Sequence, residues 1–168
     1  MSTRKSAVNA EGIAEPFHVD EVPWEEFAHG QRFGMQFQVL SQFAGASQVT
    51  VCMEVLPPEK QANQAHYHML EEEHLFILEG SMTVRLGEKA FMVESGSYVC
   101  FPAGQKVAHS IVNHTDKPCR YLILGTAQKH DVMVYPDSGR VHVKLTAESY
   151  RTSPTMEYWE SVASEPAV

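Results

Sequence analysis

Three histidines and one glutamate have the residue types and the spacing of a transition-metal site. His66 and His68 are separated by one residue, Glu73 follows five positions later, and His109 lies further along the chain. Neutral imidazole nitrogens and ionised carboxylate oxygens suit Zn, Fe, Ni, Mn or Cu better than Ca or Mg, which prefer sites made of oxygen atoms alone. These four residues therefore predict a site for one divalent transition-metal ion.

The spacing within this group indicates how β-strands could bring the side chains together. Side chains alternate across a strand, so His66 and His68 should point to the same face. The four residues between His68 and Glu73 are enough for a tight turn, so Glu73 could reach the ion from the neighbouring strand. His74 follows Glu73 directly, so we expect it on the opposite face, as a surface or packing residue.

Other polar residues near this group give weaker signals. We expect Glu71 and Glu72 to be solvated, with Glu72 as the alternative ligand if the turn shifts by one residue. Gln64 could point into the site or into solvent, and the pattern does not decide between the two. The remaining histidines have no partners at metal-ligand spacing, and we expect them to be solvated or packing residues: His18, His29, His114, His130 and His142.

Short alternating segments fill most of the chain and predict an all-β protein. The segments are brief, and Gly, Pro, Asn or charged residues separate them. None has the apolar pattern of an amphipathic helix. The expected strands are residues 34–43, 48–56, 64–68, 74–78, 82–86, 90–93, 98–101, 109–112, 120–124, 132–134 and 141–143. Strands this short and this regular are typical of a β-barrel or β-sandwich.

Two stretches resemble the signatures of the cupin superfamily. HYHMLEEEHLFILEG, from His66 to Gly80, matches H-x-H-x(3,4)-E-x6-G, although Lys60 replaces the opening glycine. GSYVCFPAGQKVAHSIVN, from Gly96 to Asn113, resembles G-x5-P-x-G-x2-H-x3-N, except that four residues separate Gly104 from His109. The spacing of His109 to Asn113 is intact, which indicates that the strand register recovers after the longer segment.

This resemblance implies a double-stranded β-helix, the cupin jelly-roll barrel, with His66, His68, Glu73 and His109 as the metal ligands. Cupins with such ligands include dioxygenases, isomerases, decarboxylases and lyases, together with ligand-binding and sensory domains. We therefore expect a mononuclear transition-metal enzyme that acts on a small oxygen-rich molecule. A non-catalytic metal-dependent binding or sensory module, and a structural relic with an empty site, are the alternatives. The resemblance does not identify a catalytic residue beyond the ligands.

The length and the boundaries of the pattern predict one domain with two extensions. We expect an N-terminal arm over residues 1–34, with the first dozen residues disordered, and the cupin barrel over residues 35–125. Residues 126–168 should form a hairpin and a tail that pack on the barrel or on a partner subunit. Tyr158 and Trp159 in this tail need an apolar surface to cover. The segment Gln36 to Ser41 would be an exposed edge strand, so we expect a homodimer.

The amino-acid composition indicates which binding partners and which cellular compartment to expect. The chain has 168 residues, with 21 acidic and 13 basic side chains and a formal charge of −8, so nucleic acid and anionic membranes are poor partners. Cys52, Cys100 and Cys119 form no metal-type pair and are expected to be reduced, buried thiols. No leader-like or membrane-length apolar segment is present. We expect a soluble cytoplasmic protein.

Overall fold

Nearly all regular structure in this protein is β-strand. The computed structural model describes residues 4–158 and 160. Its single α-helix is α1 (Leu40–Phe43), and its short 3₁₀ helices are η1 (Val19–Glu21) and η2 (Pro136–Ser138). The strands are β1 (Glu25–His29), β2 (Phe33–Val39), β3 (Val49–Leu56), β4 (Tyr67–His68), β5 (Glu73–Glu79), β6 (Ser81–Leu86), β7 (Lys89–Glu94), β8 (Tyr98–Phe101), β9 (His109–Val112), β10 (Cys119–Thr126), β11 (Val132–Tyr135), β12 (Arg140–Val143) and β13 (Glu148–Arg151).

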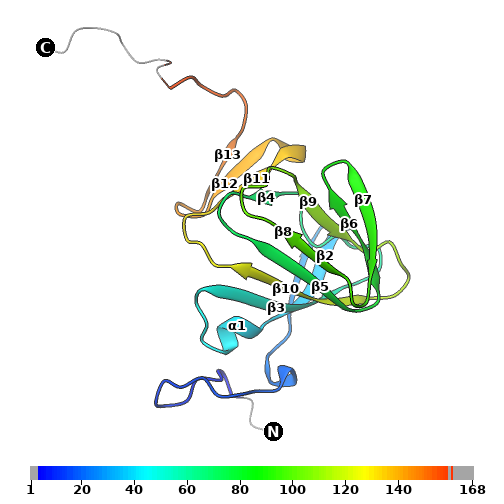
Figure 1. The fold of residues 1–168 in the computed structure, drawn as a ribbon, viewed down its shortest axis with the longest axis vertical. Coiled ribbons are helices and arrows are strands. Elements are labelled where there is room, and N and C mark those ends of the chain that lie inside the picture. The colour runs from blue at the N-terminus through cyan, green and yellow to red at the C-terminus, as the bar shows by residue number, and fades with distance from the viewer. Residues whose placement is uncertain (1–3, 159, 161–168) are drawn as a thin grey trace, which may run out of the picture.

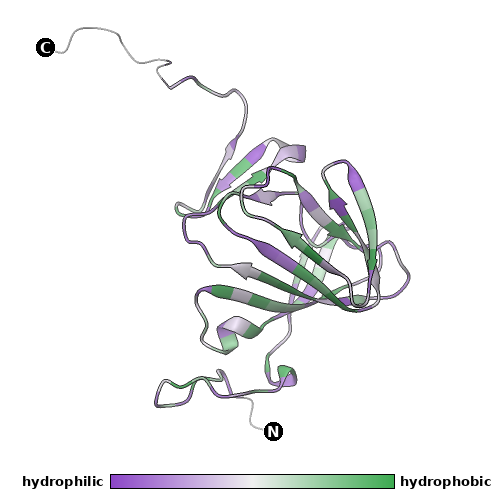
Figure 2. Ribbon diagram, in the orientation of Figure 1, coloured by the Kyte–Doolittle hydropathy of each residue, from purple (hydrophilic) through white to green (hydrophobic). Residues whose placement is uncertain are grey.

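Two sheets enclose the hydrophobic core. One has the strand order β1-β2-β3-β10-β5-β8 and the other the order β7-β6-β9, and Figure 1 shows them curving around a shared interior. Figure 2 shows apolar residues concentrated on these strands. Leu75 and Ile77 on β5 and Met82 on β6 are fully buried in one cluster. The predicted jelly-roll barrel is therefore confirmed.

The C-terminal segment extends the barrel beside the first two predicted ligands. A third sheet has the order β13-β12-β11-β4, in which Met133 of β11 pairs with His68 of β4. Strands β11 and β12 form a hairpin, and Gly139 in its turn has the left-handed conformation at a φ of +56°. Figure 1 shows β11 and β12 next to β4 at one end of the barrel. These strands are therefore placed to contribute to the predicted site.

The N-terminal part of the chain differs from the prediction in three places. Residues 4–12, which we expected to be disordered, have a defined structure, and buried Ala7 packs in one cluster with Val22 and with Phe43 of α1. The strand predicted over residues 34–43 ends at Val39, because residues 40–43 form α1. The prediction of an edge strand at Gln36–Ser41 is wrong, since β1 covers one side of β2 and β3 covers the other. The edge strands of this sheet are β1 and β8.

Three smaller predictions have mixed outcomes. Cys52, Cys100 and Cys119 are free; Cys52 and Cys119 are buried, but Cys100 is only half-buried. Tyr158 is 85% exposed in the single chain, so its packing on the barrel or on a partner subunit stays a prediction, and Trp159 lies outside the described residues. Within the described residues, no helix is long and apolar enough to cross a membrane.

The turn between β5 and β6 explains the last glycine of the first signature. Gly80 has a φ of +81°, a conformation that side chains with a Cβ rarely adopt. A Cβ at this position would lie 2.8 Å from the carbonyl oxygen of Pro118. The turn that returns β5 to β6 therefore requires glycine for both backbone conformation and space.

Candidate metal centre

Backbone pairing joins the segments of the first and third histidine. The amide of His66 donates to the carbonyl oxygen of His109 at 3.0 Å, and the amide of His109 donates back to His66 at 2.8 Å. His109 also pairs with Leu86 of β6, and its side chain is buried. The longer segment before His109 is accommodated in an exposed loop at residues 105–107, so the strand register recovers as predicted.

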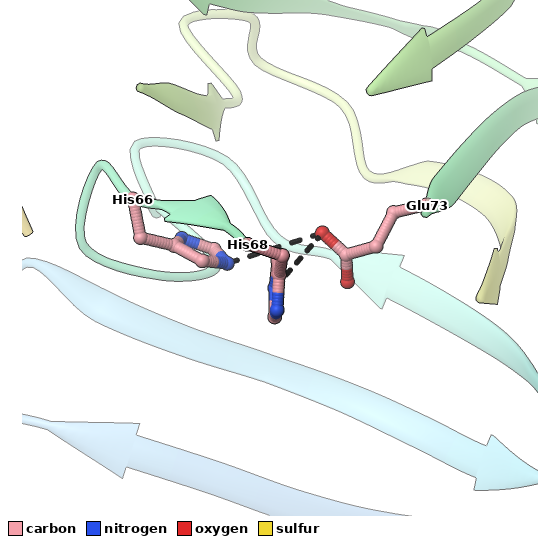
Figure 3. A group of neighbouring side chains, drawn as sticks. All are labelled: His66, His68 and Glu73. Atoms are coloured by element: carbon pink, nitrogen blue, oxygen red, sulfur yellow. Dashed lines mark ion pairs between the residues drawn. The ribbon is translucent and has the colours of Figure 1, made fainter. Parts of the chain in front are cut away.

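The side chains of His66, His68 and Glu73 converge on one point inside the barrel. Figure 3 shows both imidazoles directed toward the Glu73 carboxylate. The distances from Glu73 Oε2 are 3.9 Å to His66 Nε2 and 3.4 Å to His68 Nε2. Two ligands that each lie about 2.1 Å from one ion are at most about 4.2 Å apart. These distances fit that limit without rearrangement of the backbone.

His109 joins the group through the glutamate. Its Nε2 lies 2.9 Å from Glu73 Oε2, and its ring centroid is 4.6 Å from that of His66. The ring also stacks on Phe101, with centroids 3.9 Å apart, which fixes its orientation. The donor atoms of His66, His68 and Glu73 lie within 4.8 Å of one another, and His109 lies outside this closest set. The structure thus brings all four predicted residues together, with His109 nearest to Glu73.

Hydrogen bonds on the far side of each imidazole determine which nitrogen faces the site. His66 Nδ1 lies 2.8 Å from the carbonyl oxygen of Gln64, which can only accept, so Nδ1 carries the hydrogen. His68 Nδ1 lies 2.5 Å from Asp131 Oδ2, an oxygen that also accepts, so this Nδ1 carries a hydrogen as well. In the neutral form of each imidazole, the Nε2 atom therefore has the lone pair, and this atom faces Glu73. His68 Nε2 is buried and has no hydrogen-bond partner, as expected of an atom that would bind a metal ion.

Burial and mutual charge control protonation in this group. Burial lowers the pKa of His66 to about 4, and the neighbouring His109 acts in the same direction, so His66 is neutral at pH 7. Burial also opposes a charge on His68, but the Glu73 and Asp131 carboxylates outweigh it and raise the pKa of His68 to about 9. Although burial would raise the pKa of Glu73, His109 and His68 hold it well below its usual range. Without a metal ion, the site therefore contains an ionised Glu73 carboxylate and a neutral His66, and metal binding would displace the second proton of His68.

Asp131 is a site residue that the sequence did not reveal. It is fully buried just before β11, and besides His68 it accepts a hydrogen bond from the amide of Leu70 at 2.8 Å. Carboxylates that hold the far nitrogen of a metal-binding histidine fix the orientation of its ring and make it a better ligand. Asp131 is positioned for this role, and its distance of 63 residues from His68 leaves no local signal in the sequence.

The prediction that Glu71 is solvated is wrong. It is buried, and its Oε1 accepts from Lys144 Nζ at 2.5 Å and from the amide of Gln128 at 2.6 Å. The C-terminal segment therefore supplies a partner for this carboxylate as well. Glu71 Oε2 also lies 3.5 Å from His68 Nδ1, so the far side of that imidazole faces two acids.

His74 faces away from the cavity, as predicted. Its Nδ1 lies 2.6 Å from the hydroxyl of Tyr98, and its Nε2 lies 3.1 Å from Glu72 Oε1. Glu72 is therefore paired outside the barrel and is not placed to replace Glu73. Cys100 lies opposite His74 on β8, which completes a half-exposed group of three potential ligands on the outer surface.

A cavity of about 210 Å³ adjoins the convergent side chains. Its lining includes the ligand candidates His66, Glu73 and His109 together with apolar walls at Phe101, Ile111 and Ile123. Pockets for drug-sized ligands begin at roughly 300 Å³, so this cavity suits a smaller molecule. Leu75 and Ile77 are fully buried in the core beside it.

The cavity also contains a buried carboxylic acid that was not among the predicted site residues. Glu54 on β3 lines the same space, and its Oε2 accepts a hydrogen bond from the hydroxyl of fully buried Tyr121 at 2.6 Å. Burial raises the pKa of Glu54 to about 7, against the effect of the Tyr121 hydrogen bond, and the charge of Glu73 raises it further. Glu54 can therefore both hold and release a proton near neutral pH.

Comparisons with known proteins agree with this architecture. Residues 52–125 match the family model for the cupin domain. A crystal structure of a sugar phosphate isomerase from the cupin superfamily of Silicibacter pomeroyi is similar, with a TM-score of 0.74, 23% identity, and coverage of 84% of this chain and 95% of that one. A putative sugar phosphate isomerase from Acidithiobacillus ferrooxidans has a TM-score of 0.77 and 21% identity, with coverage of 93% and 98%.

A predicted oxalate decarboxylase from Thermotoga maritima is a more distant neighbour. Its TM-score is 0.59 and its identity 19%, with coverage of 68% of this chain and all of that one. A search of curated proteins finds no match. At these identities the structural neighbours establish the fold alone. Together, the family model and the shared fold show that the chain contains a cupin domain, matched over residues 52–125.

Proposed function

We propose that this protein is a mononuclear metal enzyme that acts on a small oxygen-rich molecule. In this proposal His66, His68, Glu73 and His109 hold one divalent transition-metal ion such as Zn, Fe, Ni or Mn. The observation that supports catalysis over simple binding is the shared cavity, in which a buried carboxylic acid, Glu54, faces the same space as the predicted ligands. Burying an acid is costly, so its presence there needs a reason beyond stability.

Each residue around the cavity has a distinct role in this proposal. A bound ion would supply Lewis acidity to hydroxyl or carbonyl oxygens of the substrate. Asp131 keeps the His68 ring in place, and Phe101 and Ile123 limit the access of water. Glu54 donates a proton to the substrate or accepts one from it, and a pKa near the operating pH is the most effective value for both steps.

Metal analysis and an activity assay together distinguish an enzyme from a non-catalytic binding module and from a structural relic with an empty site. Protein purified without chelator is analysed for metal, and product formation or oxygen consumption is measured with a panel of diols, keto acids and catechols. We expect turnover by the metal-loaded protein and a loss of at least about 100-fold in the Glu54→Gln variant, with metal content unchanged. Metal without turnover on any compound would favour the binding module. Less than about a tenth of an equivalent of metal, with no uptake on titration, would indicate the relic.

Homodimerisation in the cytoplasm is part of the proposal. The exposed edge strand β1, together with half-exposed Trp24 and Phe27, offers a surface that a second copy could cover. Light scattering coupled to size-exclusion chromatography should give twice the mass of one chain. A single-chain mass at micromolar concentration would contradict this part of the proposal.

A further inference from the structure

A second cavity opens beside the metal centre and contains a cation without an acidic partner. This cavity has a volume of about 350 Å³, and Arg140, Tyr135, His29, Asn63 and Gln64 are part of its lining. Ala62 and Asn63 also line the cavity of the metal centre, so the two spaces share a wall. We call the second space the Arg140 cavity.

The guanidinium of Arg140 is unusual among the cations near the site. Its Nε atom is buried and has no hydrogen-bond partner, and in the described part of the chain no carboxylate forms an ion pair with it. Lys144 and Arg85 on the neighbouring elements are neutralised by Glu71 and Asp137, respectively. A half-buried cation with unused donors is costly unless a ligand satisfies it.

Aromatic contacts connect Arg140 to the metal centre. The central carbon of its guanidinium lies 4.0 Å from the ring centroid of Tyr135. The same ring stacks on the His66 imidazole, with centroids 5.6 Å apart. Arg140 therefore lies within about 10 Å of the His66 ring, held in place by cation–π contact with Tyr135.

The surroundings favour a negative group in this cavity. His29 lines it, and Arg32 lies over the ring of Phe33, another lining residue, at 5.2 Å. The described residues that line this cavity include no aspartate or glutamate, although the chain as a whole has a formal charge of −8. A guanidinium presents paired N–H donors that match phosphate and carboxylate oxygens.

We propose that the Arg140 cavity binds the anionic group of the substrate, a phosphate or a carboxylate, while the oxygen-rich end of the same molecule reaches the metal centre. This inference rests on the proposed function and narrows its substrate class to small hydroxy or oxo compounds with an anionic group. The two ends are separated by at most about 10 Å, the reach of the Arg140–Tyr135–His66 contacts.

The first test measures anion binding without any metal. Inorganic phosphate and, separately, acetate are titrated into metal-free full-length protein, and dissociation constants are obtained from NMR chemical shifts. Arg140→Gln should weaken the binding at least about tenfold, the effect of losing a charged hydrogen bond. Arg120→Gln is the matched control, because Arg120 also has a buried Nε without a partner but pairs with Glu79, and it should bind as the wild type does.

The outcomes of this titration are decisive. Tighter binding of phosphate indicates a phosphorylated substrate, and tighter binding of acetate indicates a carboxylate. Equal affinity of the wild type and Arg140→Gln, or no binding to the wild type, would overturn the inference. If Arg140→Gln does not fold, Arg140→Lys keeps the charge but not the paired donors, and about threefold weaker binding is expected.

A second test connects the two ends of the substrate. With Co(II)-loaded protein, 2-phosphoglycolate should bind at least about tenfold more tightly than glycolate, and Arg140→Gln should remove this difference. Failure of the protein to take up metal would contradict the proposed function while leaving the metal-free titration valid. Equal binding of the two compounds to the metal-loaded wild type would instead contradict the phosphate form of the inference.

Discussion

The buried acid in the cavity makes the stability of the protein depend on pH in a specific way. Burial raises the pKa of Glu54 from 4.5 to about 7, so the folded state holds this proton more tightly than the unfolded state. The resulting stability is fully present below pH 4.5 and is lost as the pH rises through 7. At 1.36 kcal/mol for each pH unit, the loss is about 3 kcal/mol.

Glu54→Gln isolates this contribution, because glutamine can still accept the hydrogen bond from Tyr121 but does not titrate. Urea unfolding of metal-free protein at pH values from 4.5 to 8.5 gives the free energy of unfolding of both proteins. We expect the wild-type value minus the variant value to fall by about 3 kcal/mol over this range. Glu94→Gln, on the exposed strand β7, is the control for the same chemical change. A difference between the wild type and Glu54→Gln that stays constant with pH would refute a buried neutral acid at this position.

Two further predictions concern positions around the site and the barrel. Asp131→Asn should weaken metal binding by about 10- to 100-fold, because His68 loses its charged partner. A competition titration with a chromophoric chelator measures this affinity. The control is Asp137→Asn, on the exposed turn before β12, which should bind metal as the wild type does. Gly80→Ala should lower the free energy of unfolding by about 1–3 kcal/mol in urea, because its Cβ would meet the carbonyl of Pro118 at 2.8 Å. Gly96→Ala has a similar φ but no atom within 4 Å of its Cβ, so an equal loss there would contradict the steric reason.

The parts of the fold that depend on local pattern could be predicted from the sequence. His66 and His68 share a face because one residue separates them, and the short turn after them returns Glu73 on β5. The spacing from His109 to Asn113 also has a structural basis, since fully buried Asn113 donates to the carbonyl oxygens of Leu56 and Lys117. These hydrogen bonds hold the turn after β9 and with it the register of His109.

Contacts that join distant segments could not be predicted in the same way. Alternation identified the hairpin of β11 and β12, but it contains no information about which strand this hairpin would meet. Its pairing with β4 places Asp131, Tyr135 and Arg140 around the candidate metal centre. The sequence therefore predicted the inner group of the site, and the fold was needed to find the residues that surround it.

The burial of individual acidic side chains also could not be predicted from the sequence. Glu54 alternates with the apolar residues Met53 and Val55, so the strand pattern places it on the more polar side of β3. In the barrel, however, this side faces the cavity with Cys52. The burial of Glu71 was also not predictable from local pattern, because its partner Lys144 lies 73 residues away. Which acids are buried depends on how the sheet curves, and alternation does not specify this.

Metal content of the wild type and of a variant in which both His66 and His68 are alanine tests the central claim most directly. Elemental analysis after purification without chelator should give about one equivalent of a transition metal for the wild type and less than about a tenth for the variant. The β-sheet circular dichroism of the variant should remain, because the core is apolar and independent of the ion. Equal metal content in the two proteins would contradict a metal centre built from these side chains.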